Sequence, residues 1–507
     1  MRQVRCPVVP MMISLLLAST CAEATTTYHV SATGGDDTHD GVTWATAKRT
    51  IQGAVDAAAT DDTILVSNGV YYLAQEIVLN KGVTLKAAGT PRNSIIDGSN
   101  VCRCLNIQQT NAVIDGFSIR NGFTTNVGGG IVSYFGGVLR NCSIYNNVTS
   151  NSPSSFFNPG GGLYMEGAVI EDCAIYSNRT SSSNGGGGAR IDNSPTTPST
   201  MRRCEVYGNT SVGSGGGIRA SDSIVEDCSS HDNHSNYGSG VNAGNGATYS
   251  RCRVFNNGPG GVWLAGGTMQ NCLIYSNGAE GVLIKSGMLR SCLIYSNNTA
   301  GVRIETGDAT VENCTITRNG VGVSVRSGYA PTNVFRNVIL YGNFTGVSET
   351  NYMCESNATF ACDFSCVSPI PTNGTGNIDD GPVFADAAQM DYRLRAGSPC
   401  IDAGTNLDWM LTATDVEGQP RIFNGRADMG ADETFLAALG ITQTGQVVIS
   451  WQTVIDARNQ LQYSTNLLST NWSNIGGVST AAQWQVTGID TNPIDASRFY
   501  RVLWLRP

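Results

Sequence analysis

Charge is scarce in this sequence of 507 residues. Asp, Glu, Lys and Arg together supply 14% of the residues, and there are four histidines. The 60 glycines that accompany this shortage are typical of a turn-dense all-β protein rather than a helical one. The formal net charge of −9 argues against nucleic acid as a partner, because nucleic acid attracts basic surfaces.

Motifs that are specific for a particular catalytic or binding chemistry are also missing. The sequence contains no nucleophile elbow, no phosphate-binding loop, no HExxH zinc motif and no EF-hand calcium loop. No apolar run is long enough to span a membrane as a helix, so we expect no transmembrane segment. Any active or binding site must therefore be inferred from the way the fold arranges its residues.

The first 24 residues resemble a secretory signal. Arg2 and Arg5 precede an apolar run over residues 8–18, and small residues lead to a cleavage site after Ala24. We therefore predict a secreted or cell-surface protein. A lipoprotein modified at Cys21 is the second interpretation.

One sequence unit is repeated end to end between Gly261 and Asn319. Each copy contains a Gly, alternating apolar residues, a second Gly, a Cys two residues before an Ile, and a closing Asn. The Cys recurs every 20 to 31 residues, and an Asn follows it by five residues. The recurring positions are Cys142, Cys173, Cys204, Cys228, Cys252, Cys272, Cys292 and Cys314, with Gly116 and Val338 in the same slot at the two ends.

The short period of this repeat predicts its fold. A period near 22 residues leaves no room for a crossover helix or a four-stranded propeller blade. Each repeat is predicted instead to be one coil of short strands, and coils stacked about 4.8 Å apart pair each strand with its counterpart in the next coil. Cys and Ile then point inward, and Asn is expected to take a left-handed corner and to hydrogen-bond along the stack. The predicted fold class is all-β, a parallel β-helix whose right hand follows the bias of parallel crossovers.

With these repeats, the chain resembles the pectate-lyase-like superfamily of right-handed parallel β-helix repeat proteins over Tyr28 to Glu433. That superfamily includes lyases, hydrolases, epimerases, phage tailspikes and adhesins, so the resemblance implies a fold more firmly than a function. The opening segment resembles the family's amphipathic helix, with Ile51, Val55 and Ala58 on one face, and is expected to cap the first coil. The segment that ends at Glu433 is expected to form the last coils and a closing cap.

The composition changes after residue 433 to short runs rich in Val, Ile, Trp and Tyr. These runs predict a small β-sandwich, which resembles the fibronectin-III-like modules appended to secreted bacterial enzymes. Such a module serves as an attachment or a spacer for the enzyme. Trp451, Trp472 and Trp484 leave a second role open, in which they stack on sugars. The predicted domains are a signal peptide (1–24), a β-helix with an N-terminal helical cap (25–433) and this module (434–507).

The cysteines divide into two groups. Eight sit once per coil in an inward slot, where Cys acts as a small hydrophobe, so we predict a buried ladder of free thiols. Six others break the period and are the candidates for disulfides in a secreted protein. They are Cys102, Cys104, Cys354, Cys362, Cys366 and Cys400.

One outward face of the coils carries the candidate site residues. In the strand after each Gly, the second and fourth residues are expected to face solvent. The second column reads Val132, Tyr164, Arg190, Arg219, Asn242, Trp263, Leu283, Arg303 and Ser324, and the fourth includes Tyr134, Glu166, Asp192 and Lys285. Long linkers after Asn121, Asn147 and Asn178 are expected to build a wall beside the upper coils and so to leave a groove.

Two functions from different classes remain open for this face. In the first, it cleaves an anionic extracellular polysaccharide by β-elimination. Arg219 or Arg190 then removes the α-proton, and Tyr164 stacks or donates. Glu166 and Asp192 would hold a calcium ion, as the resemblance of the strand around Asp192 to a pectate-lyase strand implies. In the second, the charges only keep a non-catalytic or adhesive surface soluble.

The remaining expectations concern partners and cofactors. Further sugar contacts are assigned to Tyr134, Trp263, Lys285 and Arg303. If the protein is an enzyme, a polysaccharide lyase is expected first and a glycoside hydrolase second. The expected partner is an extracellular polysaccharide, the chain is expected to be a monomer, and calcium is the one cofactor considered.

Overall fold

The computed structural model of the chain describes residues 25–150, 159–194, 197–305, 307–326, 333–355, 358–423, 425–434, 437–443, 447–453, 457–466, 471–482, 485–491 and 498–505. The predicted signal peptide and Trp484 lie outside these residues.

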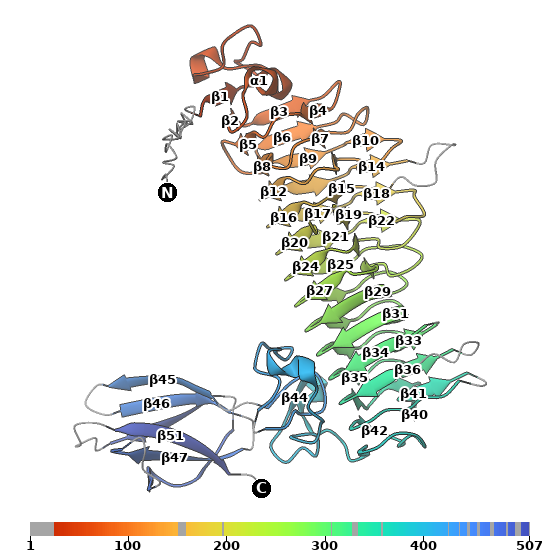
Figure 1. Cartoon of the computed structure of the whole chain (residues 1–507), viewed down its shortest axis with the longest axis vertical. Helices are drawn as coiled ribbons and strands as arrows, with labels where there is room; N and C mark the ends of the chain where they lie inside the picture. The colour runs from red at the N-terminus through yellow and green to blue at the C-terminus, as the bar shows by residue number, and fades with distance from the viewer. Residues whose placement is uncertain are drawn as a thin grey trace, which may run out of the picture.

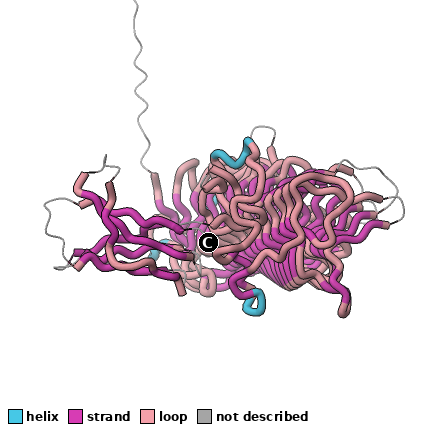
Figure 2. The backbone as a smooth tube through the Cα atoms, turned by 90° about the horizontal axis from the view of Figure 1, so that it is seen from below, coloured by secondary structure: helices cyan, strands magenta, loops and turns pink. Residues whose placement is uncertain are grey.

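Short strands stack in parallel, coil upon coil, into a β-solenoid (Figure 1). Viewed from below, the strands of successive coils superpose (Figure 2). Three ladders of parallel strands line it. Ladder 1 consists of β4 (Ile77–Leu79), β7 (Leu105–Ile107), β11 (Ile131–Ser133), β15 (Leu163–Glu166), β19 (Ala189–Asp192), β23 (Ile218–Ser221), β26 (Val241–Ala243), β29 (Val262–Gln270), β31 (Val282–Arg290), β33 (Ala300–Ile304), β36 (Val321–Val325) and β41 (Tyr352–Cys354).

The other two ladders are built the same way. Ladder 2 consists of β1 (Thr27–Val30), β2 (Thr63–Val66), β5 (Thr84–Ala87), β8 (Val113–Asp115), β12 (Val138–Arg140), β16 (Val169–Glu171), β20 (Thr200–Arg202), β24 (Ile224–Glu226), β27 (Thr248–Ser250), β34 (Ala309–Glu312) and β37 (Val334–Arg336), with β29 and β31 shared with ladder 1. Ladder 3 has 13 strands: β3 (Gly69–Tyr72), β6 (Ser94–Asp97), β9 (Ser118–Arg120), β13 (Ser143–Tyr145), β17 (Ala174–Tyr176), β21 (Glu205–Tyr207), β25 (Ser229–His231), β28 (Arg253–Phe255), β30 (Leu273–Tyr275), β32 (Leu293–Tyr295), β35 (Thr315–Thr317), β38 (Ile339–Leu340) and β42 (Cys366–Val367).

The core of the solenoid is the predicted stack of inward residues. Cys272 and Ile274 in one coil, and Cys292 and Ile294 in the next, are fully buried. Burial raises the pKa of the Cys272 thiol, so the thiol stays protonated and behaves as an apolar group. The slot at the N-terminal end needs a correction. Because Ser118 pairs with Ser143, the residue level with the first Cys is Phe117 and not Gly116.

Buried asparagines hydrogen-bond from coil to coil. The side-chain amide of Asn277 donates to Oδ1 of Asn297 at 2.9 Å, and that of Asn297 donates to Asn319 at 2.9 Å. The same contact continues through every coil from Asn147 to Asn351. This asparagine ladder satisfies amide groups that would otherwise be buried without partners.

The left-handed corner lies one residue before the position we predicted. Ser276, Ser296 and Arg318, which precede Asn277, Asn297 and Asn319, have φ of 54°, 54° and 56°. The corner residue points outward, which lets the asparagine turn inward and join its ladder.

An aromatic column that we did not predict runs along the outside of ladder 3. It contains Tyr145, Tyr176, Tyr207, His231, Phe255, Tyr275 and Tyr295. Neighbouring ring centroids lie 4.7 to 5.2 Å apart, with ring planes within 15° of parallel. The faces of the inner rings are therefore covered by their neighbours, and the column stabilises the stack rather than offering platforms to a ligand.

The predicted helical cap is wrong as a separate layer. Among the described residues, α1 (Ile51–Ala57) is the single α-helix, and it buries Ile51, Ala54 and Val55 in the core. It begins after Thr50, whose side chain accepts a hydrogen bond from the amide of Gly53 at 3.0 Å. Short 3₁₀ helices lie at Trp44–Thr46, Ala387–Gln389 and Asp408–Leu411.

The chain beyond residue 380 folds back along the lower coils instead of extending the stack. The side chain of Asn337 donates to the carbonyl of Thr405 at 2.8 Å, and the amide of Ala431 donates to Oγ1 of Thr315 at 2.9 Å. This part includes the hairpin of β43 (Phe384–Asp386) and β44 (Asp391–Leu394), and a second hairpin, β39 (Phe344–Thr345) and β40 (Ser348–Glu349), precedes it. The predicted closing cap is therefore a lateral cover.

The C-terminal part forms two small antiparallel sheets beside the end of the solenoid (Figure 1). One consists of β45 (Ala437–Gln443), β46 (Val447–Gln452) and β50 (Gln485–Asp490), and the other of β47 (Arg458–Ser464), β48 (Ser473–Asn474), β49 (Ser479–Thr480) and β51 (Phe499–Leu505). Trp451 packs in their core with Val447, Ile449 and Leu461 and is 2% exposed, so it is not available to stack on a sugar.

Two further expectations can be compared with the fold. The 14 cysteines of the described residues are all free thiols, so none of the six disulfide candidates is bonded in this structure. Cys104 is buried whereas its neighbour Cys102 is half-buried, so the two thiols occupy different environments.

Among the described residues, no helix is long and apolar enough to cross a membrane.

Candidate functional site

The second column predicted on ladder 1 is present in continuous register, but Val132, Asn242 and Leu283 in it are buried and do not face solvent as predicted. Tyr164 pairs with Arg190, and Arg190 pairs with Arg219. In the fourth column, Glu166 pairs with Asp192. The second column begins at Val132 and continues below through Asn242, Trp263, Leu283, Arg303 and Ser324.

Glycines at the corner before each strand leave the space that these side chains fill. Gly186 and Gly215 have φ of 73° and 64°, which a residue with a side chain rarely adopts. A Cβ on Gly186 would lie 2.8 Å from Cβ of Arg190, and one on Gly215 would lie 3.1 Å from Cβ of Arg219. The glycine corners therefore position both arginines.

Tyr164 is a buried tyrosine on an outward column. It is 8% exposed, and its hydroxyl donates to Oε1 of Glu166 at 2.5 Å. The ring of Tyr134 lies 5.5 Å away, centroid to centroid, and the guanidinium of Arg190 lies 5.7 Å from the Tyr164 centroid. Burial, together with the hydrogen bond to Glu166, raises the pKa of Tyr164. The hydroxyl therefore keeps its proton and can donate it.

Arg190 and Asp192 form an ion pair that is mostly shielded from water. Nε of Arg190 donates to Oδ2 of Asp192 at 2.8 Å, and the two side chains are 16% and 14% exposed. Nη1 of Arg190 and Oδ1 of Asp192 are buried, and within the described part of the chain neither has a hydrogen-bond partner. Buried polar atoms without partners destabilise a fold by about 1–3 kcal/mol each, so this pair is stabilised less than a fully hydrogen-bonded one.

Arg219 lies one coil below and is held by a linker. Its Nη1 donates to the carbonyl of Asn184 at 2.5 Å, whereas its Nε is buried without a partner among the described residues. Burial lowers the pKa of Arg219, and the positive charge of Arg190 lowers it further. Arg219 therefore loses a proton more readily than an ordinary arginine.

The long linkers form a structure of their own. Each opens with a short strand, and the four strands pair in parallel as β10 (Phe123–Thr124), β14 (Val148–Thr149), β18 (Arg179–Thr180) and β22 (Thr210–Ser211). Beyond them, Val127 packs in a small apolar cluster with Val132 and Tyr164, and Asn184 holds Arg219. The linkers therefore reach the outward column, and the predicted groove itself stays a prediction.

The lower coils carry a second group of predicted contacts. The ring of Trp263 lies 5.4 Å from that of Tyr237, a linker residue that the repeat did not reveal and that is 53% exposed. Lys285 leaves the fourth column, because a register shift pairs Ala265 with Ser286. Arg303 lies 3.8 Å from Glu305 in a half-exposed pair.

The donor set does not fit the expected calcium ion. Calcium takes about six to eight oxygen ligands. Glu166 already accepts from Tyr164, and Asp192 already pairs with Arg190. No group of three or more His, Cys, Asp or Glu suited to a metal occurs in the described ranges. Calcium binding here stays a prediction, and we derive no chemical step through it.

Comparison with known protein families shows the family of this chain. Residues 103–277 and 265–364 match the right-handed β-helix region, which together is just over half of the 507 residues. The chain belongs to the right-handed β-helix family. No curated protein matches the sequence.

Several solved structures are similar to this chain at low identity. Pectate lyase Pel9A is 15% identical with a TM-score of 0.39, over 81% of this chain and 97% of that one. The A-module of Azotobacter vinelandii mannuronan C-5 epimerase AlgE6 is 16% identical with a TM-score of 0.28, over 64% and 88%. XylC in complex with xylose is 11% identical with a TM-score of 0.37, over 94% and 100%. These similarities assign no activity to this chain.

Proposed function

We propose that the chain binds an anionic extracellular polysaccharide along ladder 1 and cleaves it by β-elimination at Tyr164, Arg190 and Arg219. One observation carries this proposal: Nη1 of Arg190, Oδ1 of Asp192 and Nε of Arg219 are buried close together, and no group in the described part of the chain hydrogen-bonds to them. Charges that served only to keep a strand surface soluble would be exposed and hydrated instead.

The proposed reaction needs one base and one acid. A base removes the proton on the carbon next to the sugar carboxylate, and that electron pair becomes a carbon–carbon double bond. The bond to the glycosidic oxygen breaks, and this oxygen takes up a proton. Arg219 is the proposed base, because its pKa is lowered by burial. Arg190 would face the substrate carboxylate, and Tyr164, whose hydroxyl is protonated and donates to Glu166, would turn to protonate the leaving oxygen.

A binding surface without catalysis is the second candidate. The pairing of Tyr164 with Glu166 and of Arg190 with Asp192 favours it, since each pair already engages groups that catalysis would use. In this case sugars would still stack on exposed rings such as Tyr134 and Tyr237.

One experiment separates these functions. The secreted protein is incubated with a panel of uronic-acid polysaccharides, with and without calcium, and the ultraviolet absorbance of the unsaturated product is followed. A rise in absorbance supports the lyase. New reducing ends without that absorbance would instead show a glycoside hydrolase. Binding without either product supports the non-catalytic surface, and no binding of any polymer would contradict both candidates.

Two proposals concern the rest of the chain. We propose secretion after cleavage behind Ala24, which the N-terminal sequence of the mature protein would test.

We also propose that the C-terminal sheets form a fibronectin-III-like β-sandwich that serves as an attachment or a spacer for the solenoid. Their antiparallel pairing and shared apolar core support this proposal.

A further inference from the structure

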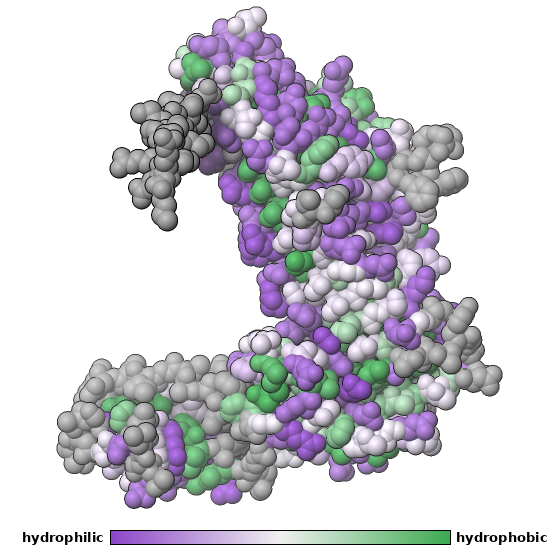
Figure 3. All heavy atoms as spheres, in the orientation of Figure 1, coloured by the Kyte–Doolittle hydropathy of each residue, from purple (hydrophilic) through white to green (hydrophobic). Residues whose placement is uncertain are grey.

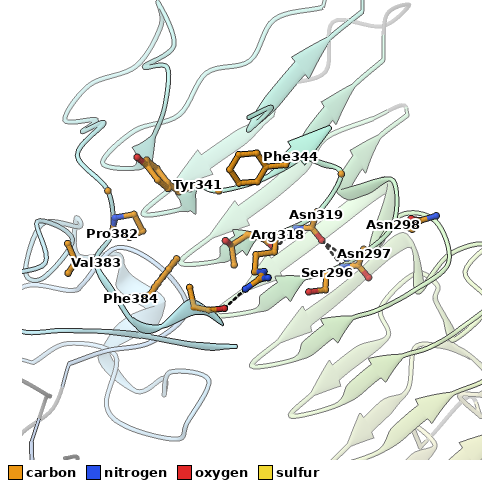
Figure 4. Close-up of a pocket in the computed structure, with 15 residues that line it drawn as sticks. Ser296, Asn297, Asn298, Arg318, Asn319, Tyr341, Phe344, Pro382, Val383 and Phe384 are labelled. Atoms are coloured by element: carbon orange, nitrogen blue, oxygen red, sulfur yellow. Dashed lines mark hydrogen bonds between the residues drawn. The ribbon is translucent and has the colours of Figure 1, made fainter. Parts of the chain in front are cut away.

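A pocket of about 960 Å³ lies at the lower end of ladder 3, beside the corners that lead from its last strands into ladder 1. Its walls come from three coils and from the segment that folds back over them (Figure 4). Pockets of about 300–1,000 Å³ hold small-molecule ligands in proteins. Hydrophobic side chains also gather at this end of the solenoid, whereas the upper coils are mostly hydrophilic on the face that Figure 3 shows.

The aromatic column of ladder 3 is interrupted beside the pocket, and there the ring of Tyr392 from the folded-back segment lies 5.2 Å from that of Tyr295, tilted by 55°. Below Tyr295 the next outward residue in register is Thr317, and an aromatic residue returns one coil later as Tyr341. A small side chain thus stands where a ring would continue the stack, and Thr317 lines the pocket. Among the described residues, no ring stacks on Tyr341 or on Phe344, which is 51% exposed. Phe344 therefore offers an exposed ring to a ligand, and Tyr341, half-buried against an apolar cluster, lines the pocket beside it.

The polar groups of the pocket divide into a saturated floor and an open rim. Asn297 and Asn319 on the floor belong to the asparagine ladder and hydrogen-bond to each other. The rim carries Ser296, Asn298 and Arg318, which precede or follow these asparagines (Figure 4). Hydroxyl, amide and guanidinium groups around an aromatic surface suit a ring with one apolar face and polar edges, which is the shape of a pyranose.

Arg318 supplies the charge. Its guanidinium donates to the carbonyl of Ala387 on the opposite wall, and its side chain is exposed. In the described ranges it forms no ion pair with a carboxylate, and none of the lining residues is acidic. Burial raises the pKa of Tyr341, and the nearby charges of Glu349, Asp379 and Asp380 raise it further, so Arg318 supplies the positive charge beside these carboxylates. A guanidinium without a charged partner beside aromatic rings favours a ligand carboxylate.

We infer that this pocket is a second saccharide site, which binds a uronic-acid unit with its apolar face on Tyr341 and Phe344 and its carboxylate toward Arg318. The inference rests on the pocket's own chemistry and not on the proposed cleavage, because no residue of the ladder 1 site lines it.

Titration calorimetry tests this site with trigalacturonate as the probe and galactotriose as its neutral control. The titrations use the full chain carrying Arg190→Gln and Arg219→Gln, which remove the proposed carboxylate contact and the proposed base of the other site. Trigalacturonate should bind, and galactotriose should bind at least roughly tenfold more weakly. Adding Arg318→Gln or Phe344→Ala should weaken trigalacturonate binding by roughly tenfold or more. The matched control Arg326→Gln, an exposed arginine outside the pocket, should change nothing.

Three results would overturn the inference: no binding of trigalacturonate in this background, equal binding of both sugars, or affinities unchanged by Arg318→Gln and Phe344→Ala. None of them bears on the cleavage proposal, which is measured on the chain with Arg219 intact.

Discussion

At the scale of single residues, the repeat predicted roles more reliably than it predicted exact positions. The inward Cys and Ile, the outward column from Tyr164 to Arg219 and the asparagine ladder all follow from spacing, because each coil places its counterpart residues in register. Tyr237 and Asn184 could not be predicted. They lie in linkers whose lengths differ from coil to coil, so the repeat assigns them no position.

The cysteine ladder leads to a prediction about stability. Cys272→Ser should lower the free energy of unfolding by about 1–3 kcal/mol, because it buries a hydroxyl in an apolar slot. Chemical denaturation measures this change. Thiol titration of the denatured protein should also find at least eight free thiols, and a smaller number would show that the ladder is oxidised.

Tyr164 leads to a prediction about binding. Tyr164→Ala should weaken the binding of an oligouronide by about 1–3 kcal/mol, since it removes a buried ring that packs under Arg190 and the donor to Glu166. Calorimetry on this variant measures the loss, with Tyr72→Ala, an exposed tyrosine far from the column, as the control. Equal losses in the two variants would argue against a specific role for Tyr164.

At the scale of elements, sequence reasoning succeeded for strands and failed for packing between non-neighbouring segments. The periodicity of the sequence predicts which way each strand faces. It cannot predict that residues beyond 380 fold back onto ladder 3, because the hydrogen bond between Asn337 and Thr405 joins residues far apart in the sequence. The shift that moves Lys285 out of its column is likewise a local irregularity between β29 and β31 and leaves no periodic signal.

The folded-back segment leads to a prediction about pH. Burial raises the pKa of Asp428 to about 6, and burial with the charge of Asp428 raises the pKa of Glu433 to about 9. A carboxyl group whose pKa is higher in the folded state than in the unfolded state contributes stability that is fully present below its unfolded pKa, which is 3.8 for Asp428 and 4.5 for Glu433. This stability is lost as the pH rises through the folded-state pKa values of about 6 and about 9. The segment should therefore unfold at a lower temperature at pH 9 than at pH 5.

Thermal unfolding of the parent and of Glu433→Gln across this range would test the prediction. Gln does not titrate, so the decline toward pH 9 should flatten in the variant. A melting temperature that rises from pH 5 to pH 9 in the parent would contradict the assigned direction.

At the scale of the whole molecule, the chain combines one long solenoid with two small C-terminal sheets. The two parts have separate apolar cores. We therefore expect limited proteolysis to cut near residues 433–437 and to release two stable pieces. Cleavage that appears only when the whole chain unfolds would show that the parts are not independent.

The central claim is that the coils around Arg219, and not those lower down, carry catalysis. The most direct measurement compares kcat/KM on a uronic-acid polysaccharide for Arg219→Gln and for Arg303→Gln, an arginine of the same column four coils away. Arg219→Gln should lower kcat/KM by about 10²-fold or more, as expected for loss of a catalytic base. Arg303→Gln should leave it within about twofold. In the parent, activity should rise with pH, because the proposed base is the neutral form of Arg219, whose pKa is lowered by burial. An unchanged rate in Arg219→Gln with a large loss in Arg303→Gln would contradict the account and move the site to the lower coils.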